Sequence, residues 1–186
     1  VPVSIAQRKG DPIVVDSDEH PRASTTLEAL AKLKPVVTAE GTVTAGNASG
    51  INDGAAAVLI ASEQAVEQYQ LKPRAKIIAS TAVGVEPRIM GFAPAPAIKK
   101  LLKQANLTLE QMDVIELNEA FAAQALAVTR DLGLADDSTQ VNPNGGAIAI
   151  GHPLGASGAR LMTTALNQLE QTGGTYALCS MCIGVG

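Results

Sequence analysis

The sequence predicts an α/β fold, because residues 42–186 alternate between short apolar runs and longer segments with helical periodicity. Glycine, proline and asparagine separate these segments and predict turns between them. Strands are expected at 55–61, 75–83, 114–117 and 175–182. Helices are expected from Ser62 onward and at 94–105, 119–132 and 155–171. We found no short tandem repeat.

Residues 1–41 are polar and look irregular, with turn signals at 9–12 and at His20-Pro21. Ser24 or Thr25 is expected to cap a short helix that carries Leu27 and ends before Pro35. This part of the chain is therefore not expected to contribute to the core.

The elements that follow each have a local reason. Ser62 is a favoured N-cap residue, and Gly84 and Pro87 end the strand at 75–83. Thr108 is expected to open a short turn that includes Glu110 and Gln111.

The second half repeats the strand-then-helix order. Residues 114–117 are continuously apolar apart from Glu116, as in a buried strand, and Asn118 can cap the helix after it. The helix at 155–171 is expected to face inward through four residues, which are Leu161, Ala165, Leu166 and Leu169.

Composition excludes several classes of function. The net charge is −4 and no basic face is apparent, which argues against nucleic acid or an anionic membrane as partner. No run resembles a signal peptide or a spanning helix. Two cysteines in apolar surroundings fit a reducing compartment, so a cytoplasmic location is expected.

Residues 142–160 hold one of the two histidines, His152, in a nearly uncharged loop rich in glycine. Glycine permits positive φ and close backbone approach, so this loop can hold an imidazole against a bulky group. The alternative is a tight turn between a strand and a helix. Likewise, Asn118 and Phe121 can be a helix cap and a core residue rather than site residues.

Cys179 and Cys182 form a Cys-x-x-Cys pair at the end of the chain. A redox pair or half a zinc site is one interpretation, but there is no second cysteine pair and no histidine at finger spacing, so no metal is expected. Inert buried thiols are a second interpretation. In the third, Cys182 beside glycine is an acid/base or nucleophilic thiol.

Together, Asn118-Glu119-Ala120-Phe121, Gly151-His152-Pro153 and Cys182-Ile183-Gly184 resemble the three C-terminal signatures of the thiolases, in the same order and spacing. Residues 43–56 and 88–91 resemble the same family, and the resemblance covers essentially the whole chain. Residues 18–22, 113–117 and 141–144 are most similar to the 3-oxoadipyl-CoA thiolases of aromatic-acid degradation.

The resemblance implies a layered αβα thiolase fold built from two duplicated halves. By it, residues 1–41 are a remnant of the lid or loop domain, and residues 42–186 are most of the second half without its last strand. The family's nucleophilic cysteine belongs to the first half, so the isolated 186 residues are expected to be inactive. An inactive CoA-binding fragment, a lipid-binding or ketosynthase-like relative, and a biosynthetic acetoacetyl-CoA thiolase are the alternatives.

The resemblance also assigns roles in the cleavage of a 3-oxoacyl-CoA by CoA. His152 activates the nucleophilic thiol and, with a water held by Asn118, forms an oxyanion hole. Cys182 is the second acid/base thiol, and the backbone N–H of Gly184 faces the acyl-enzyme carbonyl. An unperturbed thiol titrates at about 8.5, so only modest activation of Cys182 is expected.

Four residues are expected to contact CoA by the same resemblance, namely Ser49, Met90, Ala120 and Phe121. Ordinary core packing is the alternative for each of them. The family often has Gly-Pro where this chain has Ala93-Pro94, so the acyl pocket is expected to differ in shape. CoA is a substrate, no tightly bound cofactor is implied, and a homo-oligomer, dimer or tetramer, is expected. His20 is expected on the surface.

Overall fold

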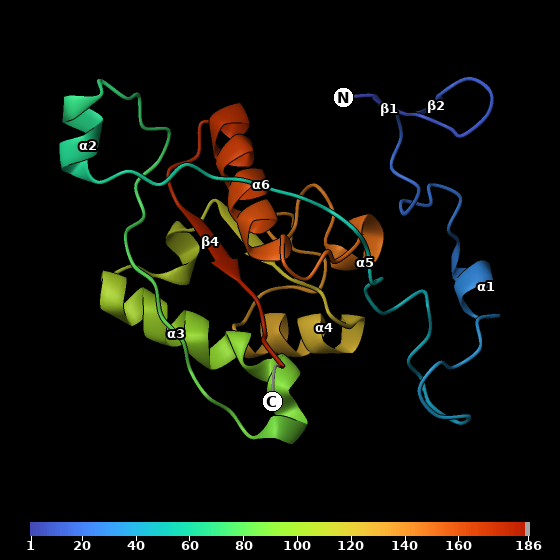
Figure 1. Cartoon of the computed structure of the whole chain (residues 1–186). Helices are drawn as coiled ribbons and strands as arrows, with labels where there is room; N and C mark the ends of the chain where they lie inside the picture. The colour runs from blue at the N-terminus through green and yellow to red at the C-terminus, as the bar shows by residue number, and fades with distance from the viewer. Residues whose placement is uncertain (185–186) are drawn as a thin grey trace.

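The computed structural model describes residues 1–184, and a parallel pair of strands lies at its centre. The strands are β3 (Val114–Leu117) and β4 (Ala177–Ser180). Helix α6 (Ser157–Thr172) packs on one side of them, and α3 (Pro94–Ala105) and α4 (Ala122–Asp131) lie on the other (Figure 1). This helix–sheet–helix layering is the α/β arrangement that the sequence predicts.

β3 and β4 pair in register from Val114 opposite Ala177 to Leu117 opposite Ser180. All four β3 residues are buried, as is typical of a parallel strand covered on both faces. A parallel bridge from Ile115 to Val141 extends the pairing on the other edge of β3. The last strand is thus shorter than the expected 175–182.

Local signals explain where the helices begin and end. Pro94 occupies the first turn of α3, and Asn106 ends it in the left-handed conformation at φ 53°. Gly173 ends α6 in the same way at φ 71°. The expected turn at Thr108 is confirmed: its side chain and that of Gln111 form a capping box around the 3₁₀ helix η2 (Leu109–Gln111).

The main core lies where the sheet meets α3, α4 and η2. Its buried members are all aliphatic or thioether side chains, which pack closely, and the partly buried Phe92 and Tyr176 pack against them. These buried members are Ala95, Ile98, Met112, Ile115, Leu117, Val128 and Leu178.

Residues 1–41 are more regular than expected. β1 (Val3–Ile5) and β2 (Ile13–Val15) form a short antiparallel hairpin, and α1 (Leu27–Leu30) follows. The cap of α1 is Thr26, not Ser24 or Thr25, because the Thr26 hydroxyl accepts the N–H of Ala29 at 3.2 Å. The whole segment lies to one side of the layered body (Figure 1).

The strands expected at 55–61 and 75–83 are wrong as paired strands: both segments carry no regular element. The helix expected at Ser62 does form, as α2 (Glu63–Gln68), with the Ser62 hydroxyl accepting the N–H of Ala65 at 3.1 Å. A β-strand needs a neighbour for its backbone groups, and none of the described residues pairs with either segment.

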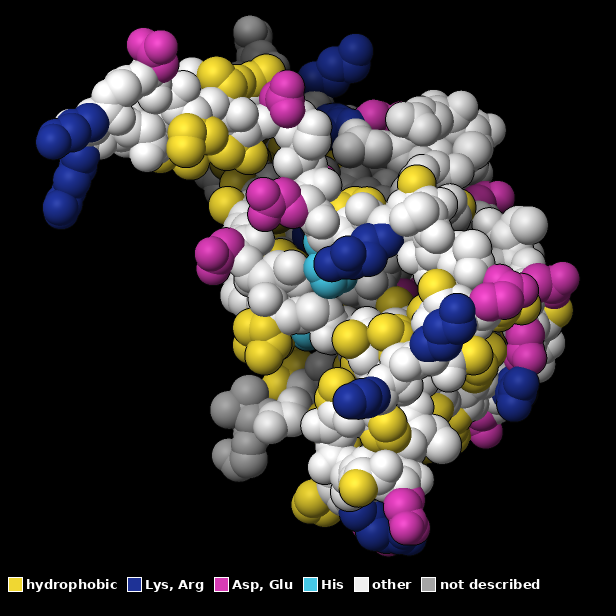
Figure 2. Space-filling view, turned by 90° about the vertical axis from the view of Figure 1, so that its right-hand side faces the viewer, with side chains coloured by type: hydrophobic (Ala, Val, Ile, Leu, Met, Phe, Trp, Pro, Cys, Tyr) yellow, Lys and Arg dark blue, Asp and Glu magenta, His cyan; other side chains and the backbone are white. Residues whose placement is uncertain are grey.

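Large apolar side chains are consequently exposed along these segments, among them Leu59, Ile60, Ile77 and Ile78. Figure 2 shows hydrophobic side chains at the surface in several places between charged ones. In the described part of the chain, we find no helix with the length and apolar character that crossing a membrane requires.

Core packing gives the first testable prediction. Ile98 on α3 is 1% exposed, so Ile98→Ala leaves a cavity and is expected to lower the free energy of unfolding by about 2–5 kcal/mol. Gln104→Ala, at an exposed position of the same helix, is the control and should stay within about 0.5 kcal/mol of the wild type. Urea unfolding of both variants makes the measurement, and equal midpoints would contradict the assigned core.

Candidate active site

Asn118 directly follows β3, and its position is fixed by the sheet. Its backbone N–H donates to the carbonyl of Ser180 at the end of β4, at 2.9 Å, and its side chain is 0% exposed. Helix α4 begins at Ala122, with Phe121 as the N-cap residue. The capping alternative for Asn118 is therefore wrong, and its amide is free for another use.

The single helical turn α5 (Ala147–Ile150) ends at Gly151, which has φ 95°, and His152 is the next residue. This left-handed backbone at Gly151 turns the chain so that the His152 side chain points inward, and His152 is only 9% exposed. Its Nε2 lies 3.4 Å from Nδ2 of Asn118, and its Nδ1 lies 2.6 Å from the Ser157 hydroxyl. Two of the three predicted catalytic side chains thus meet in a buried contact.

Two features of this contact concern charge and hydrogen bonding. Burial, and secondarily the positive charge of Arg160, lower the pKa of His152, which favours a neutral imidazole. The side-chain oxygen of Asn118 is buried and has no partner among the described residues. Because buried polar atoms are nearly always satisfied, this oxygen marks a place for a water or a ligand atom.

Cys182 lies two residues beyond β4, at the same edge of the sheet as Asn118, and is buried. Burial raises the pKa of its thiol, so the structure favours the protonated form rather than an activated thiolate. No hydrogen bond joins this thiol to Asn118 or His152 in the described residues. Burial, with the charge of Glu116, raises the pKa of Cys179 to about 12, as expected for an inert thiol.

The predicted CoA-contacting residues form two groups. A Cβ built on Gly184 would lie 2.8 Å from the methyl carbon of Met90, so the 3₁₀ helix η1 (Pro87–Phe92) packs against the end of the described chain. The backbone N–H of Ser49 donates to the carbonyl of Ala120 at 3.0 Å, next to an antiparallel β-bridge between Ala48 and Phe121. The structure therefore places Met90 with Gly184, and Ser49 with Ala120 and Phe121.

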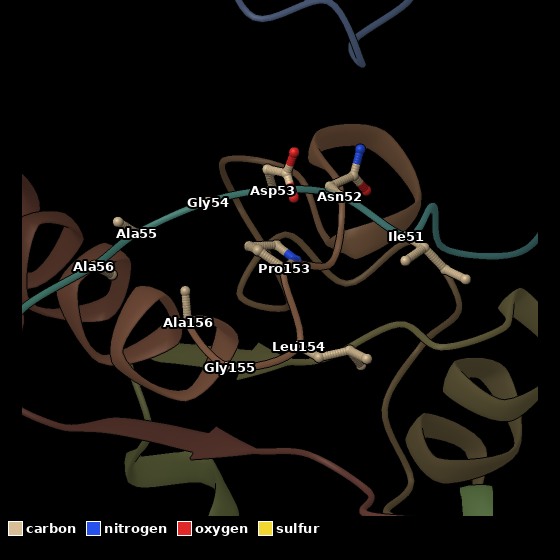
Figure 3. A pocket seen from close by; sticks show the side chains of 10 residues that line it. All are labelled: Ile51, Asn52, Asp53, Gly54, Ala55, Ala56, Pro153, Leu154, Gly155 and Ala156. Atoms are coloured by element: carbon tan, nitrogen blue, oxygen red, sulfur yellow. The ribbon is translucent and has the colours of Figure 1, made fainter.

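A groove of about 430 Å³ lies between residues 51–56 and residues 153–156, directly after His152. Figure 3 shows the extended segment 51–56 crossing over the turn from Pro153 to Ala156, with Asn52 and Asp53 as its polar side chains. None of the predicted site residues lines this groove.

Glu119 holds the glycine-rich loop in place, a role that our sequence analysis missed. Its carboxylate accepts the amide of Asn142 at 2.9 Å and the backbone N–H of Ile148 at 3.2 Å. The Asn142 amide also pairs with both backbone groups of Leu117 at 2.8 Å, as a neighbouring strand would. One half-buried amide thus joins the end of β3 to the loop that carries His152.

His20 is half-buried and joins two segments, so its expected surface position is wrong. Its Nε2 lies 3.1 Å from the carbonyl of Ile148, and its Nδ1 lies 3.3 Å from the Asn52 amide nitrogen. The Asn52 oxygen then accepts the backbone N–H of His152 at 3.0 Å. Residues far apart in the sequence therefore support the loop that carries His152. No local sequence pattern predicts these contacts of His20 and Asn52.

A buried ion pair lies behind the site. Glu116 of β3 is 0% exposed, and its carboxylate accepts from the Arg160 guanidinium on α6 at 3.1 Å. Burial raises the pKa of Glu116 to about 7, although Arg160 opposes the shift. Such pairs contribute little net stability, so its effect is chiefly electrostatic, on His152 and Cys179.

The packing of Gly146 gives a second prediction. A Cβ at this position would overlap the Glu119 carboxylate, whereas a Cβ at Gly155 in the same loop meets nothing within 4 Å. We expect Gly146→Ala to displace the Glu119 carboxylate and so to break its hydrogen bonds to Asn142 and Ile148. Losing such bonds should lower the thermal unfolding midpoint by several degrees. Gly155→Ala, the matched control, should leave the midpoint nearly unchanged. An equal loss in both variants would show that Glu119 does not hold the loop in place.

The lowered pKa of His152 gives a third prediction. Below the usual imidazole pKa of about 6.5, the unfolded chain binds a proton that the folded site resists. The His152 contribution to the free energy of unfolding should therefore fall as the pH drops from about 7 to about 5. Urea titrations of wild type and His152→Gln at both pH values test this: an equal pH dependence in the two proteins would show that His152 is not held neutral.

The chain is similar to known proteins over its whole length. Residues 1–64 match the family model described as "Thiolase, N-terminal domain", and residues 71–186 match "Thiolase, C-terminal domain". The chain is 86% identical to the beta-ketoadipyl-CoA thiolase of Acinetobacter baylyi and 59% identical to the 3-oxoadipyl-CoA/3-oxo-5,6-dehydrosuberyl-CoA thiolase of Escherichia coli K12. Each match covers 100% of this chain but 46% of the relative, so the chain spans less than half of these proteins.

Solved structures give the same result for the fold. The Bacillus anthracis acetyl-CoA acetyltransferase matches with a TM-score of 0.92 and 45% identity, over 100% of this chain and 46% of that one. Human mitochondrial 3-ketoacyl-CoA thiolase in complex with CoA matches with a TM-score of 0.83 and 46% identity, over 94% and 44%. The family models together span nearly the whole sequence, and the chain therefore belongs to the thiolase family.

Proposed function

We propose that this chain is part of a thiolase that cleaves 3-oxoadipyl-CoA with CoA, giving acetyl-CoA and a shortened acyl-CoA. The observation that carries the proposal is the buried contact of Asn118 with His152 at 3.4 Å, beside the end of β4 that leads to Cys182. The 86% identity to a beta-ketoadipyl-CoA thiolase supports the substrate, whereas an acetyl-CoA acetyltransferase of Syntrophomonas wolfei is 54% identical.

The reaction breaks a carbon–carbon bond and needs a thiol nucleophile and two sites for developing negative charge. By family resemblance the nucleophile is a cysteine of the other half of the thiolase fold. A neutral His152 accepts its proton as the thiolate attacks the 3-oxo carbon. The acetyl-CoA enolate then leaves, and its oxygen is stabilised by His152 and by a water on the Asn118 amide.

Cys182 supplies the proton that the enolate needs. Its raised pKa supports this role, because a protonated thiol is the form required in the cleavage direction. After transfer, the resulting thiolate regains a proton from solvent or from the incoming CoA thiol. The backbone N–H of Gly184 faces the carbonyl oxygen of the acyl-enzyme in this proposal.

CoA is a substrate here and no tightly bound cofactor is required. Ser49, Ala120 and Phe121 form one wall of the proposed pantetheine path, since they are joined by backbone pairing. Met90 forms the wall next to Gly184. We propose a cytoplasmic homo-oligomer for the whole protein, with residues 1–41 in its lid and residues 42–186 in its C-terminal domain.

The whole protein is expected to release acetyl-CoA from 3-oxoadipyl-CoA and CoA, whereas residues 1–186 alone should not. Asn118→Ala in the whole protein should lower kcat by roughly 100- to 1000-fold, the usual cost of a lost oxyanion donor.

Cys182→Ala should abolish exchange of the acetyl-CoA methyl protons with solvent but still allow acyl-enzyme formation. Cys179→Ala is the matched control, because the Cys179 thiol is assigned no chemistry.

Proton exchange followed by NMR and acyl-enzyme detection by mass spectrometry separate these steps. Normal exchange in Cys182→Ala would remove Cys182 from the mechanism. Turnover by residues 1–186 alone would contradict the need for a nucleophile outside them, and failure of the whole protein to cleave any 3-oxoacyl-CoA would refute the proposed function.

A further inference from the structure

Ser157 is the first residue of α6, and its side chain is in a fully buried position next to His152. Its hydroxyl oxygen lies 2.6 Å from Nδ1 of His152 and 3.0 Å from the carbonyl oxygen of Pro153. The Pro153 carbonyl also accepts the backbone N–H groups of Ala156 and Ser157, which fixes this turn. The hydroxyl is therefore held between one imidazole nitrogen and one carbonyl.

The single hydroxyl proton of Ser157 sets the direction of each hydrogen bond. A carbonyl oxygen can only accept, so the single hydroxyl proton of Ser157 is directed to Pro153. Ser157 must then accept from His152, which places a proton on Nδ1 and leaves Nε2 as a bare acceptor in the neutral ring. The other side of the ring agrees, because the group near Nε2 is the NH₂ of Asn118, a donor.

We propose that Ser157 is a positioning residue that fixes both the tautomer and the ring orientation of His152, so that Nε2 faces the nucleophilic thiol as a proton acceptor. This inference rests on the proposed function for its chemical meaning. In this step the thiol S–H bond breaks and an Nε2–H bond forms, while the Nδ1 proton stays on Nδ1 and is donated to the Ser157 oxygen. The new Nε2–H can then donate to the enolate oxygen.

A serine in this place differs physically from a carboxylate. A carboxylate would stabilise the imidazolium by its charge, whereas a neutral hydroxyl orients the ring without adding negative charge. Arg160, one turn further along α6, adds a positive charge that disfavours the imidazolium. The surroundings therefore keep His152 ready to accept a proton, and the proton it accepts is easily passed on.

The test compares three variants of the whole protein. Ser157→Ala removes the acceptor, and Ser157→Thr keeps a hydroxyl. Thr163→Val is the matched control, because the Thr163 hydroxyl donates to the carbonyl of Ala159 four residues earlier, as Ser157 does to Pro153, without touching a histidine. We expect kcat to fall roughly 10- to 100-fold in Ser157→Ala with a smaller change in KM, to recover in Ser157→Thr, and to be normal in Thr163→Val.

A second readout reports the tautomer directly and does not depend on turnover. In protein labelled with ¹⁵N in its imidazoles, the His152 signals, assigned by their loss in His152→Gln, should show a protonated Nδ1 and a bare Nε2 in the wild type. Ser157→Ala should shift them toward a mixture of the two tautomers. This signature would uphold the role of Ser157 even if the protein proved unable to cleave 3-oxoadipyl-CoA.

Two results would overturn the inference. One is a wild-type His152 that carries its proton on Nε2. The other is a Ser157→Ala protein whose tautomer and kcat are both unchanged. If Ser157→Ala is too unstable to purify, Ser157→Thr decides alone: a mixed tautomer despite the retained hydroxyl contradicts the proposal, and the wild-type signature supports it.

Discussion

The parallel pairing of β3 with β4 is the constraint on which the rest of the site depends. Parallel strands end at the same edge of a sheet, so the residues after Leu117 and after Ser180 emerge side by side. The bond from the Asn118 N–H to the Ser180 carbonyl fixes this edge at 2.9 Å. Asn118 and Cys182 thus belong to one edge although they lie far apart in the sequence.

The histidine reaches the same edge by a different route. It lies in the loop before α6, and α6 packs across both strands. Glu119 and Asn52 hold this loop by accepting the backbone N–H groups of Ile148 and His152, and the Asn142 side chain joins it to Leu117 at the end of β3. The imidazole is thus left free for Asn118 and Ser157. Polar side chains therefore satisfy the backbone groups of this loop and fix the direction of its chain, as backbone hydrogen bonds do between the strands of a sheet.

Burial decides the protonation states in the site. Withdrawal from water raises the pKa of Cys182 and lowers the pKa of His152, so both groups are favoured in their neutral forms. Neutral groups suit a reaction in which protons move between a thiol, an imidazole and an enolate, since neither group must lose a strong charge partner first. Arg160, the partner of the buried Glu116, adds a positive charge that further lowers the pKa of His152.

The sequence by itself determined the α/β class, the central strand 114–117 and the caps at Ser62 and Thr108, because these depend on apolar runs and on residues a few positions apart. Its motifs also determined the family. Only the tertiary structure decided that Asn118 contacts an imidazole rather than capping a helix, that His20 supports the loop through Asn52, and that 55–61 and 75–83 lack partners in the described chain. These features depend on which distant segments pack together, and a hydrogen bond between distant residues leaves no periodic trace in the sequence.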